Sequence, residues 1–321
     1  MSSIWSKIIE SVILTRMSNF LKELNLPDCL QTAYQKGLSC ADAVFVTQEA
    51  LLTHLREGGH PYLCLFDLEK AFDSVEFPNL LNKLFQVGIR GKLWRIILKW
   101  YTSAKNRIRV NGVLSDSYNI IHRGVKQGSV LSPLLFVLIL DDLLKNLRKE
   151  EAGLTVGGNF VGGAAHADDL RTAAISKESI MQQWNIINKF TTSRNLKLNS
   201  SKTEILKISR KLPGKSQLNL SDHCVNISTS VKCLGIWWQH DLKAQRAVKE
   251  NISKARKAFF AFGKLDAFEG KLNPLSSSSI YMTCVLSVLL YGCETWILDK
   301  SMLSLLENFP AEIGRRILKL Y

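Results

Sequence analysis

The stretch GGAAHADDLRTAA, residues 162–174, places two adjacent carboxylates, Asp168 and Asp169, between runs of Gly, Ala and Leu. Aspartate is disfavoured in β-strands, and two like charges side by side repel each other. The segments on both sides have strand character, so the chain must reverse at the pair, and one interpretation is a plain Asp-containing turn. The other interpretation is a site that binds a positively charged group.

A third carboxylate, Asp67, ends the nearly all-apolar run PYLCLFD, residues 61–67. Such a run is typical of a strand that is covered on both faces. A charged group at the end of a buried strand is costly unless it is paired or points into a cleft, although Asp67 also suits the start of a turn. If the carboxylates of Asp67 and Asp168–Asp169 meet, they form an oxygen-rich pocket suited to Mg²⁺.

The charge balance suggests a polyanionic partner. The 321 residues include 42 Lys and Arg against 28 Asp and Glu, a formal net charge of +14. Nucleic acid is the simplest partner for this surplus, anionic membrane is a weaker alternative, and a basic surface without a partner is the third. The seven cysteines are scattered and none forms a C-x-x-C pair, which predicts reduced, buried thiols in an intracellular protein and no zinc site.

Hydrophobic periodicity predicts an α+β body up to about residue 240, followed by a helical module. We expect helices over residues 1–24, 41–56, 77–88, 91–104, 134–150, 177–195 and 241–265. Short strands are expected at 61–67, on both sides of the Asp pair, at 196–206 and at 231–238. Asn111-Gly112 between alternating residues predicts a hairpin over 107–120.

The first helix is predicted to pack through one apolar face, whose members are Ile4, Ile8, Val12, Phe20 and Leu24. A mitochondrial targeting signal is the alternative interpretation of this stretch. The longest apolar runs, residues 134–140 and 285–291, are too short to span a bilayer. We therefore expect no transmembrane segment, no secretion, and a nuclear or cytoplasmic location.

Five blocks resemble the successive motifs of reverse transcriptases, and their order and spacing are similar to those of non-LTR retrotransposons in particular. The blocks are FDLEKAFDSV (66–75), RGVKQGSVLSPLLF (123–136), HADDL (166–170), LKLNSSKTEIL (196–206) and KCLGIWW (232–238). The resemblance covers residues 8–240 and continues more weakly through LLYGCETWIL (289–298) and RRILKL (315–320).

This resemblance implies an RNA-directed DNA polymerase with a right-hand fold, an antiparallel palm sheet packed on helices, and a helical thumb. Residues 1–58 and 76–130 would form incomplete fingers, residues 59–75 and 131–236 the palm, and residues 237–321 the thumb and post-thumb segment. The implied partners are an RNA template, a DNA primer and a dNTP.

The resemblance also assigns roles to single residues. Asp67, Asp168 and Asp169 would hold two Mg²⁺ ions, which Mn²⁺ can replace, and these ions would activate the primer 3′-hydroxyl and stabilise the leaving pyrophosphate. Phe72 would exclude the 2′-hydroxyl of a ribonucleotide, and Lys202 would act as a general acid near the pyrophosphate. The remaining assignments are Gln127 and Gly128 at the template and incoming nucleotide, Arg123 as a brace of their loop, Lys36 near the triphosphate, and Leu234 with Gly235 as the primer grip.

Each assignment also has a plain structural interpretation. Phe72 suits core packing, Gly128 suits a simple turn, and Leu234-Gly235 suits a core hairpin. Arg123 and Lys202 suit solvated surface charges.

Two positions depart from the family pattern. His166 stands where the family usually has Tyr or Phe, and Gln35 stands where it often has the arginine that contacts the triphosphate. The chain begins just upstream of the block QTAYQKGLSC (31–40), so we expect it to be part of a longer reading frame. The leading hypothesis is a non-LTR reverse transcriptase. An inactive transposon-derived remnant that binds RNA or an RNA–DNA hybrid is the alternative, and a template-independent phosphotransferase is the third.

Overall fold

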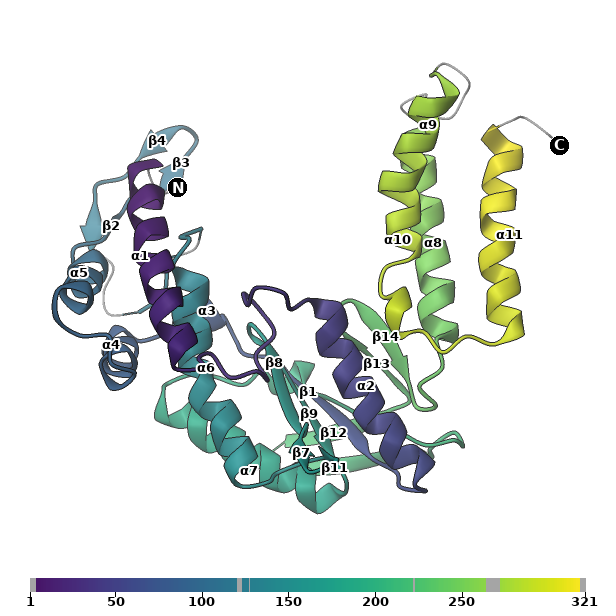
Figure 1. Cartoon of the computed structure of the whole chain (residues 1–321), viewed down its shortest axis with the longest axis horizontal. Coiled ribbons are helices and arrows are strands. Elements are labelled where there is room, and N and C mark those ends of the chain that lie inside the picture. The colour runs from purple at the N-terminus through teal and green to yellow at the C-terminus, as the bar shows by residue number, and fades with distance from the viewer. Residues whose placement is uncertain (1–3, 120–122, 127, 222, 264–271, 318–321) are drawn as a thin grey trace.

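The computed structural model of the chain describes residues 4–119, 123–126, 128–221, 223–263 and 272–317 (Figure 1). The helices are α1 (Ile4–Glu23), α2 (Cys40–Arg56), α3 (Ala71–Ser74), α4 (Phe77–Gln86), α5 (Gly91–Thr102), α6 (Ser132–Lys149), α7 (Lys177–Ser193), η1 (Ser200–Lys202), α8 (Gln245–Gly263), α9 (Pro274–Ile280), η2 (Tyr281–Leu286), α10 (Ser287–Leu289), η3 (Cys293–Thr295) and α11 (Lys300–Ile317). The strands are β1 (Tyr62–Phe66), β2 (Lys105–Asn106), β3 (Arg109–Val110), β4 (Val113–Leu114), β5 (Tyr118–Asn119), β6 (Thr155–Val156), β7 (Asn159–Phe160), β8 (Gly163–His166), β9 (Asp169–Ala174), β10 (Glu204–Lys207), β11 (Ser216–Leu220), β12 (His223–Ser228), β13 (Ser230–Cys233) and β14 (Ile236–Gln239).

A six-stranded sheet carries the carboxylates singled out in the sequence. Its strand order is β11–β12–β10–β1–β9–β8, and β1 pairs with β9 on one side and β10 on the other. All neighbours are antiparallel except β10 and β12, which are parallel because the β11–β12 hairpin joins the sheet through its second strand. The antiparallel sheet expected from the sequence is therefore confirmed, with one parallel pair added at β10 and β12.

The two faces of this sheet are covered by different elements (Figure 1). On β1, Cys64 belongs to the apolar core that includes Phe136 of α6, whereas the neighbouring Leu63 belongs to the core that includes Leu51 of α2 and Val231 of β13. Successive side chains of a strand point to opposite faces, so a strand with both faces buried needs an apolar residue at every position. The run at 61–67 is thus a doubly covered strand, as predicted.

Helix α1 forms where the sequence predicts a helix, but a different face is buried. Ile13, Met17 and Leu21 are buried, together with Glu10. The predicted face is 36% to 77% exposed and comprises Ile4, Ile8, Val12, Phe20 and Leu24. Both sets recur at helical spacing, so the periodicity alone does not decide which stripe meets the core. Glu10 lies on the buried stripe, where its carboxylate accepts hydrogen bonds from Trp100 and from the backbone of Val130, and these bonds favour burial of that stripe.

The hairpin at 107–120 has its turn at Asn111-Gly112, where the sequence predicts it. Strands β3 and β4 pair antiparallel across Asn111 and Gly112, which both have positive φ, at 48° and 86°. Two such residues form the type I′ turn that favours Asn-Gly. The predicted hairpin is confirmed.

All seven cysteines are free, as predicted, but only Cys64 and Cys233 are buried. Cys29 lies in a loop and Cys224 at an exposed position of β12, so the prediction of buried thiols is wrong for these two. Apolar neighbours in the sequence do not bury a residue of a strand whose side chain points outward.

The helical module after residue 240 has an apolar core of its own, in which α8 packs against η2, α10 and α11 (Figure 1). In the described part of the chain, one helical stretch, Leu275–Thr295, is long and apolar enough to cross a membrane by length and composition. Only 22% of its apolar window is buried. The apolar run 285–291 is thus part of a longer helical stretch than the sequence indicates, and Val285 and Leu289 pack in the same cluster as Val248 of α8.

Candidate active site

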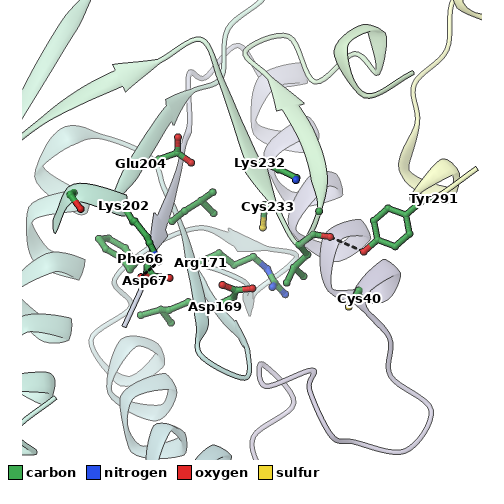
Figure 2. Close-up of a pocket in the computed structure, with 15 residues that line it drawn as sticks. Cys40, Phe66, Asp67, Asp169, Arg171, Lys202, Glu204, Lys232, Cys233 and Tyr291 are labelled. Carbon is green, nitrogen blue, oxygen red and sulfur yellow. Dashed lines mark hydrogen bonds and ion pairs between the residues drawn. The ribbon is translucent and has the colours of Figure 1, made fainter. Parts of the chain in front are cut away.

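Antiparallel pairing of β1 with β9 brings the acidic residues together. Phe66 pairs with Leu170 at the end of this ladder, so Asp67 follows β1 beside Asp169, the first residue of β9. Asp168 lies in the two-residue turn between β8 and β9. Asp67 and Asp168 line one cavity of about 470 Å³, and Asp67 and Asp169 line a larger cleft of about 730 Å³ (Figure 2). The residues predicted as metal ligands therefore converge.

The negative charges of Asp67 and Asp168 repel that of Asp169. Partial burial, followed by the negative charges of Asp168 and Asp67, raises the pKa of Asp169 above its ordinary value. No three of the described His, Cys, Asp and Glu side chains form a ready-made metal-binding group. Carboxylate oxygens that share cavities and repel one another still have the donor chemistry that a hard divalent cation prefers, and such a cation would relieve the repulsion.

The turn that carries Asp168 is held by a buried glutamine. Ala167 has φ of +56°, a conformation that costs energy for a residue with a Cβ. Its N–H donates to Oε1 of Gln31 at 3.0 Å, and the same oxygen accepts the N–H of Ala33 at 3.0 Å. Gln31 is 0% exposed. The sequence analysis missed this residue, because nothing local in QTAYQKG indicates that it reaches a turn more than 130 positions away.

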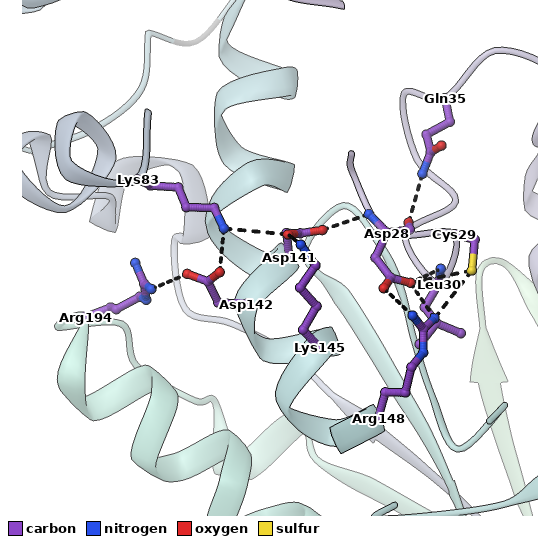
Figure 3. Close-up of polar contacts among 10 residues, drawn as sticks. All are labelled: Asp28, Cys29, Leu30, Gln35, Lys83, Asp141, Asp142, Lys145, Arg148 and Arg194. Atoms are coloured by element: carbon purple, nitrogen blue, oxygen red, sulfur yellow. Dashed lines mark hydrogen bonds and ion pairs between the residues drawn. The ribbon is translucent and has the colours of Figure 1, made fainter. Parts of the chain in front are cut away.

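The segment that contains Gln31 is fastened to α6 (Figure 3). The carboxylate of Asp28 accepts two hydrogen bonds from Arg148, both at 2.7 Å, and the N–H of Asp28 donates to the buried carboxylate of Asp141 at 2.7 Å. Asp141 in turn pairs with Lys145 at 2.8 Å. Charged groups hydrogen-bonded in this way fix geometry as well as contribute energy. Helix α6 therefore positions Gln31, and through it the turn of Asp168.

His166 is the middle member of a hydrogen-bonded chain. Its Nε2 lies 3.3 Å from Sγ of Cys40, and its Nδ1 lies 3.0 Å from Oγ1 of Thr32. Thr32 Oγ1 donates to the carbonyl of Ala165 at 3.1 Å, so the chain is consistent when Nδ1 carries the imidazole proton. Burial, followed by the charge of Arg171, lowers the pKa of His166. The imidazole thus links Thr32 and Cys40 to the turn that carries Asp168.

Lys202 and Phe72 both lie beside the carboxylates. The ammonium of Lys202 is 3.1 Å from Oδ2 of Asp67, and Lys202 lines both the cavity and the cleft. The ring of Phe72 lines the cavity with Asp67 and Asp168 and stacks on Phe136, with the ring centroids 4.5 Å apart. Phe72 therefore packs on the core and faces the cavity at once.

The turn Leu234–Gly235 faces the same cleft as Asp67 and Asp169. Both turn residues have positive φ, at 48° and 84°, and connect β13 to β14. This is type I′ geometry, which a leucine adopts only at a cost. Tyr291 supports the turn by donating its hydroxyl to the carbonyl of Leu234 at 2.8 Å (Figure 2).

Residues 1–238 match the model of the reverse transcriptase (RNA-dependent DNA polymerase) family. The chain belongs to this family. It is 30% identical over 168 residues to the retrovirus-related Pol polyprotein from type-1 retrotransposable element R2 of Nasonia vitripennis, which covers 51% of this chain and 16% of that protein. It is 23% identical over 261 residues to the RNA-directed DNA polymerase from mobile element jockey of Drosophila funebris, which covers 79% of this chain and 28% of that protein. The chain thus spans a small part of the length of these relatives.

A solved structure shows the same architecture as this reverse transcriptase chain. The telomerase of Candida tropicalis in complex with a fragment of telomeric RNA superposes with a TM-score of 0.54 at 13% identity, and covers 89% of this chain and 46% of that one. At this identity the likeness concerns the fold alone. The predicted right-hand polymerase fold is confirmed.

Other described residues that the family pattern singles out do not share the cavity or the cleft with the carboxylates. Of the described residues, Lys36, Arg123 and Gly128 are not among those that line the cavity or the cleft. Arg123 pairs with Glu76 at 2.9 Å, which fits a brace of its loop. Gln127 lies outside the described residues.

Gln35, at the position where the family often has an arginine, turns inward. Its amide donates to the carbonyls of Asp28, at 3.1 Å, and of Gln31 (Figure 3). The Gln35 side chain thus forms hydrogen bonds to the backbone of its own loop. An arginine here would present a charge that Gln35 cannot supply.

Arg171, two positions after Asp169 in sequence, is the largest fully buried side chain described. It lines the cleft from β9, and burial lowers the pKa of its guanidinium group (Figure 2). The sequence analysis passed over it, although a charged residue at an inward-pointing strand position is a signal in itself.

Proposed function

We propose that this chain carries out RNA-templated DNA synthesis for a non-LTR retrotransposon, by joining dNTPs to the 3′-hydroxyl of a primer. The observation that carries the proposal is the convergence of Asp67 and Asp168, from distant parts of the chain, on one cavity. Membership of the reverse transcriptase family supports it. The partners would be an RNA template and a DNA primer, and the compartment, nuclear or cytoplasmic, stays a prediction.

Reverse transcriptases generally depend on divalent metal ions. We propose that Asp67, Asp168 and Asp169 hold Mg²⁺, or Mn²⁺ in its place. When bound, such ions lower the pKa of an attacking hydroxyl and neutralise charge on a leaving pyrophosphate. The raised pKa of Asp169 supports this assignment, because the folded chain keeps a carboxylate where burial, and after it the like charges of Asp168 and Asp67, disfavour the ionised form.

Lys202 and Phe72 would act on opposite ends of the incoming nucleotide. Lys202 holds its ammonium proton at the edge of both cavities, where it can be donated to the departing pyrophosphate. Phe72 is fixed by its stacking on Phe136, so it presents a rigid wall to the position of a 2′-hydroxyl. An unbranched, mobile side chain would exclude that hydroxyl less well.

The primer end would lie against Leu234–Gly235, because this turn and the carboxylates line one cleft. Gln127 and Gly128 would contact the template and the nucleotide, Arg123 would brace their loop, and Lys36 would approach the triphosphate. Fingers at 1–58 and 76–130, palm at 59–75 and 131–236, and thumb from 237 remain the proposed division of the chain.

The test is primer extension on poly(rA)/oligo(dT) with Mg²⁺, with Asp168→Ala as the control and the single-stranded primer alone as a second control. We expect incorporation of dTTP that requires both the template and Asp168. Incorporation no greater than that of the Asp168→Ala chain refutes the proposed activity. Equal incorporation without template favours a template-independent phosphotransferase.

One observation favours a second candidate function, RNA or RNA–DNA hybrid binding without catalysis. Gln35 is turned onto its own loop, so this position offers the triphosphate no cation. A gel shift that weakens steeply with salt, together with no incorporation, would support the binding function.

A further inference from the structure

Arg171 presents an unusual arrangement for a buried guanidinium group. It is 2% exposed, and its Nε donates to Oγ1 of Thr47 at 3.1 Å. Its Nη1 and Nη2 are buried, and neither has a hydrogen-bond partner within the described part of the chain. A guanidinium group stays charged in proteins, and leaving its donors unsatisfied away from water is costly. An anion with two oxygens would satisfy both nitrogens and balance their charge.

The neighbouring side chains do not provide this partner. Arg171 takes part in no ion pair among the described residues, in contrast to Lys202, which pairs with Asp67. Cys233 lies close by, but burial raises the pKa of its thiol to about 11, so it is uncharged at neutral pH. The charge of Asp169 favours the charged form of Arg171, but the two side chains form no ion pair among the described residues, so Nη1 and Nη2 remain without a direct partner there.

The surroundings of Arg171 are those of an open cleft with further cations. Arg171, Lys232 and Lys202 all line it, and Figure 2 shows the nitrogen end of Arg171 pointing toward Cys40. The planar fork of a guanidinium group matches two oxygens of a phosphate, whereas Lys232 is exposed and supplies a mobile point charge. We propose that Arg171, assisted by Lys232, binds a phosphate group on the floor of this cleft.

A phosphate in a polymerase can come from the nucleotide, from the template strand or from the primer strand. The cavity that Phe72 shares with Asp168 does not include Arg171 or Lys232 among its described lining residues. The cleft that includes both is the one lined by the Leu234–Gly235 turn. The phosphate bound by Arg171 is therefore a backbone phosphate of the primer strand near its 3′ end. This inference rests on the proposed function.

The experiment measures binding without turnover. The full chain is titrated against a fluorescent RNA–DNA template–primer in EDTA, and affinity is read by anisotropy. A series of primers carries one uncharged methylphosphonate in place of each of the last few phosphodiesters. For the unchanged chain, we expect one linkage whose neutralisation weakens binding roughly tenfold, which is typical of a hydrogen-bonded charge pair. This measurement needs no altered protein, so misfolding does not affect it.

The same series is then run with Arg171→Met and Arg171→Lys, and with Arg210→Met as a matched control, because Arg210 is exposed and lies past the far end of β10. The proposal predicts that Arg171→Met loses the linkage-specific effect, that Arg171→Lys keeps part of it, and that Arg210→Met keeps all of it. An identical linkage profile in all four chains, or no sensitive linkage, overturns the proposal. A change in KM for dTTP or in inhibition by pyrophosphate, with an unchanged linkage profile, assigns the phosphate to the nucleotide instead and also overturns it. Absence of any template–primer binding by the unchanged chain refutes the proposed function itself.

Discussion

Replacing Gln31 by leucine removes the acceptor that holds the acidic turn. Leucine has nearly the volume of glutamine, so the change leaves little cavity, but it takes away Oε1 from the N–H groups of Ala167 and Ala33. Both bonds are buried, so water cannot replace the lost acceptor. Ala167 then has less to hold it at φ of +56°. We expect the turn to relax and Asp168 to leave its place in the cavity.

The size of the effect follows from two unsatisfied donors. A buried donor without a partner costs about 1–3 kcal/mol, so two donors cost about 2–6 kcal/mol if the turn stays in place. Relaxation of the turn lowers that figure, because it recovers part of the backbone strain, about 1–3 kcal/mol for a residue of this kind. The substitution also removes Nε2 of Gln31, a buried donor with no hydrogen-bond partner among the described residues, which lowers the figure further. We expect the free energy of unfolding to fall by about 1–3 kcal/mol and primer extension to be lost.

Urea unfolding followed by tryptophan fluorescence gives the change in stability. The matched control is Gln35→Leu, the same substitution in the same loop, which removes donors to the carbonyls of Asp28 and Gln31 but touches no residue of the turn. We expect this variant to lose about 1 kcal/mol and to retain most of its extension activity. Equal losses of stability and activity in the two variants would refute the role given to Gln31.

Three further variants test other parts of the site. Asp169→Asn should make the chain more stable at pH values above the range in which Asp169 titrates, seen as a larger free energy of unfolding. Its folded-state pKa is raised, so ionisation costs stability as pH rises from 3.8 through the folded value, and the gain should vanish below 3.8 in a urea series. Tyr291→Phe, which loses the bond to Leu234, should cost about 1 kcal/mol and raise the KM for primer, and an unchanged KM would count against the primer-grip role. Lys202→Met breaks the ion pair with Asp67, in which the lysine side chain is 65% exposed and the aspartate side chain 30% exposed. It should therefore change the free energy of unfolding by less than about 1 kcal/mol, yet slow single-nucleotide incorporation at least about 100-fold.

Local signals in the sequence were enough for much of the fold. The nearly all-apolar run 61–67 is typical of a strand buried on both faces, and Asn111-Gly112 specified its turn through backbone conformation alone. The convergence of Asp67 with Asp168 was also predictable, because the motif order of the family carries long-range information that periodicity lacks. These features depend on residues adjacent in sequence or on inherited spacing.

The features that were missed depend on contacts between distant segments. Which stripe of α1 is buried depends on where the Glu10 carboxylate finds donors on α5 and beyond. Gln31 acts on Ala167 through tertiary packing, and Arg171 became conspicuous only when its nitrogens proved to lack partners. No pattern within a single segment reports the environment on the opposite side of a cleft.

The account depends on Asp67 and Asp168 acting together on a divalent cation. Crystals of the chain with a template–primer, soaked in Mn²⁺ and measured at the manganese absorption edge, would locate the ion by its anomalous scattering. We predict an anomalous peak coordinated by carboxylate oxygens of both Asp67 and Asp168, and its absence from crystals of Asp168→Ala. A peak bound elsewhere, or two carboxylates turned away from each other with no peak between them, would contradict the account.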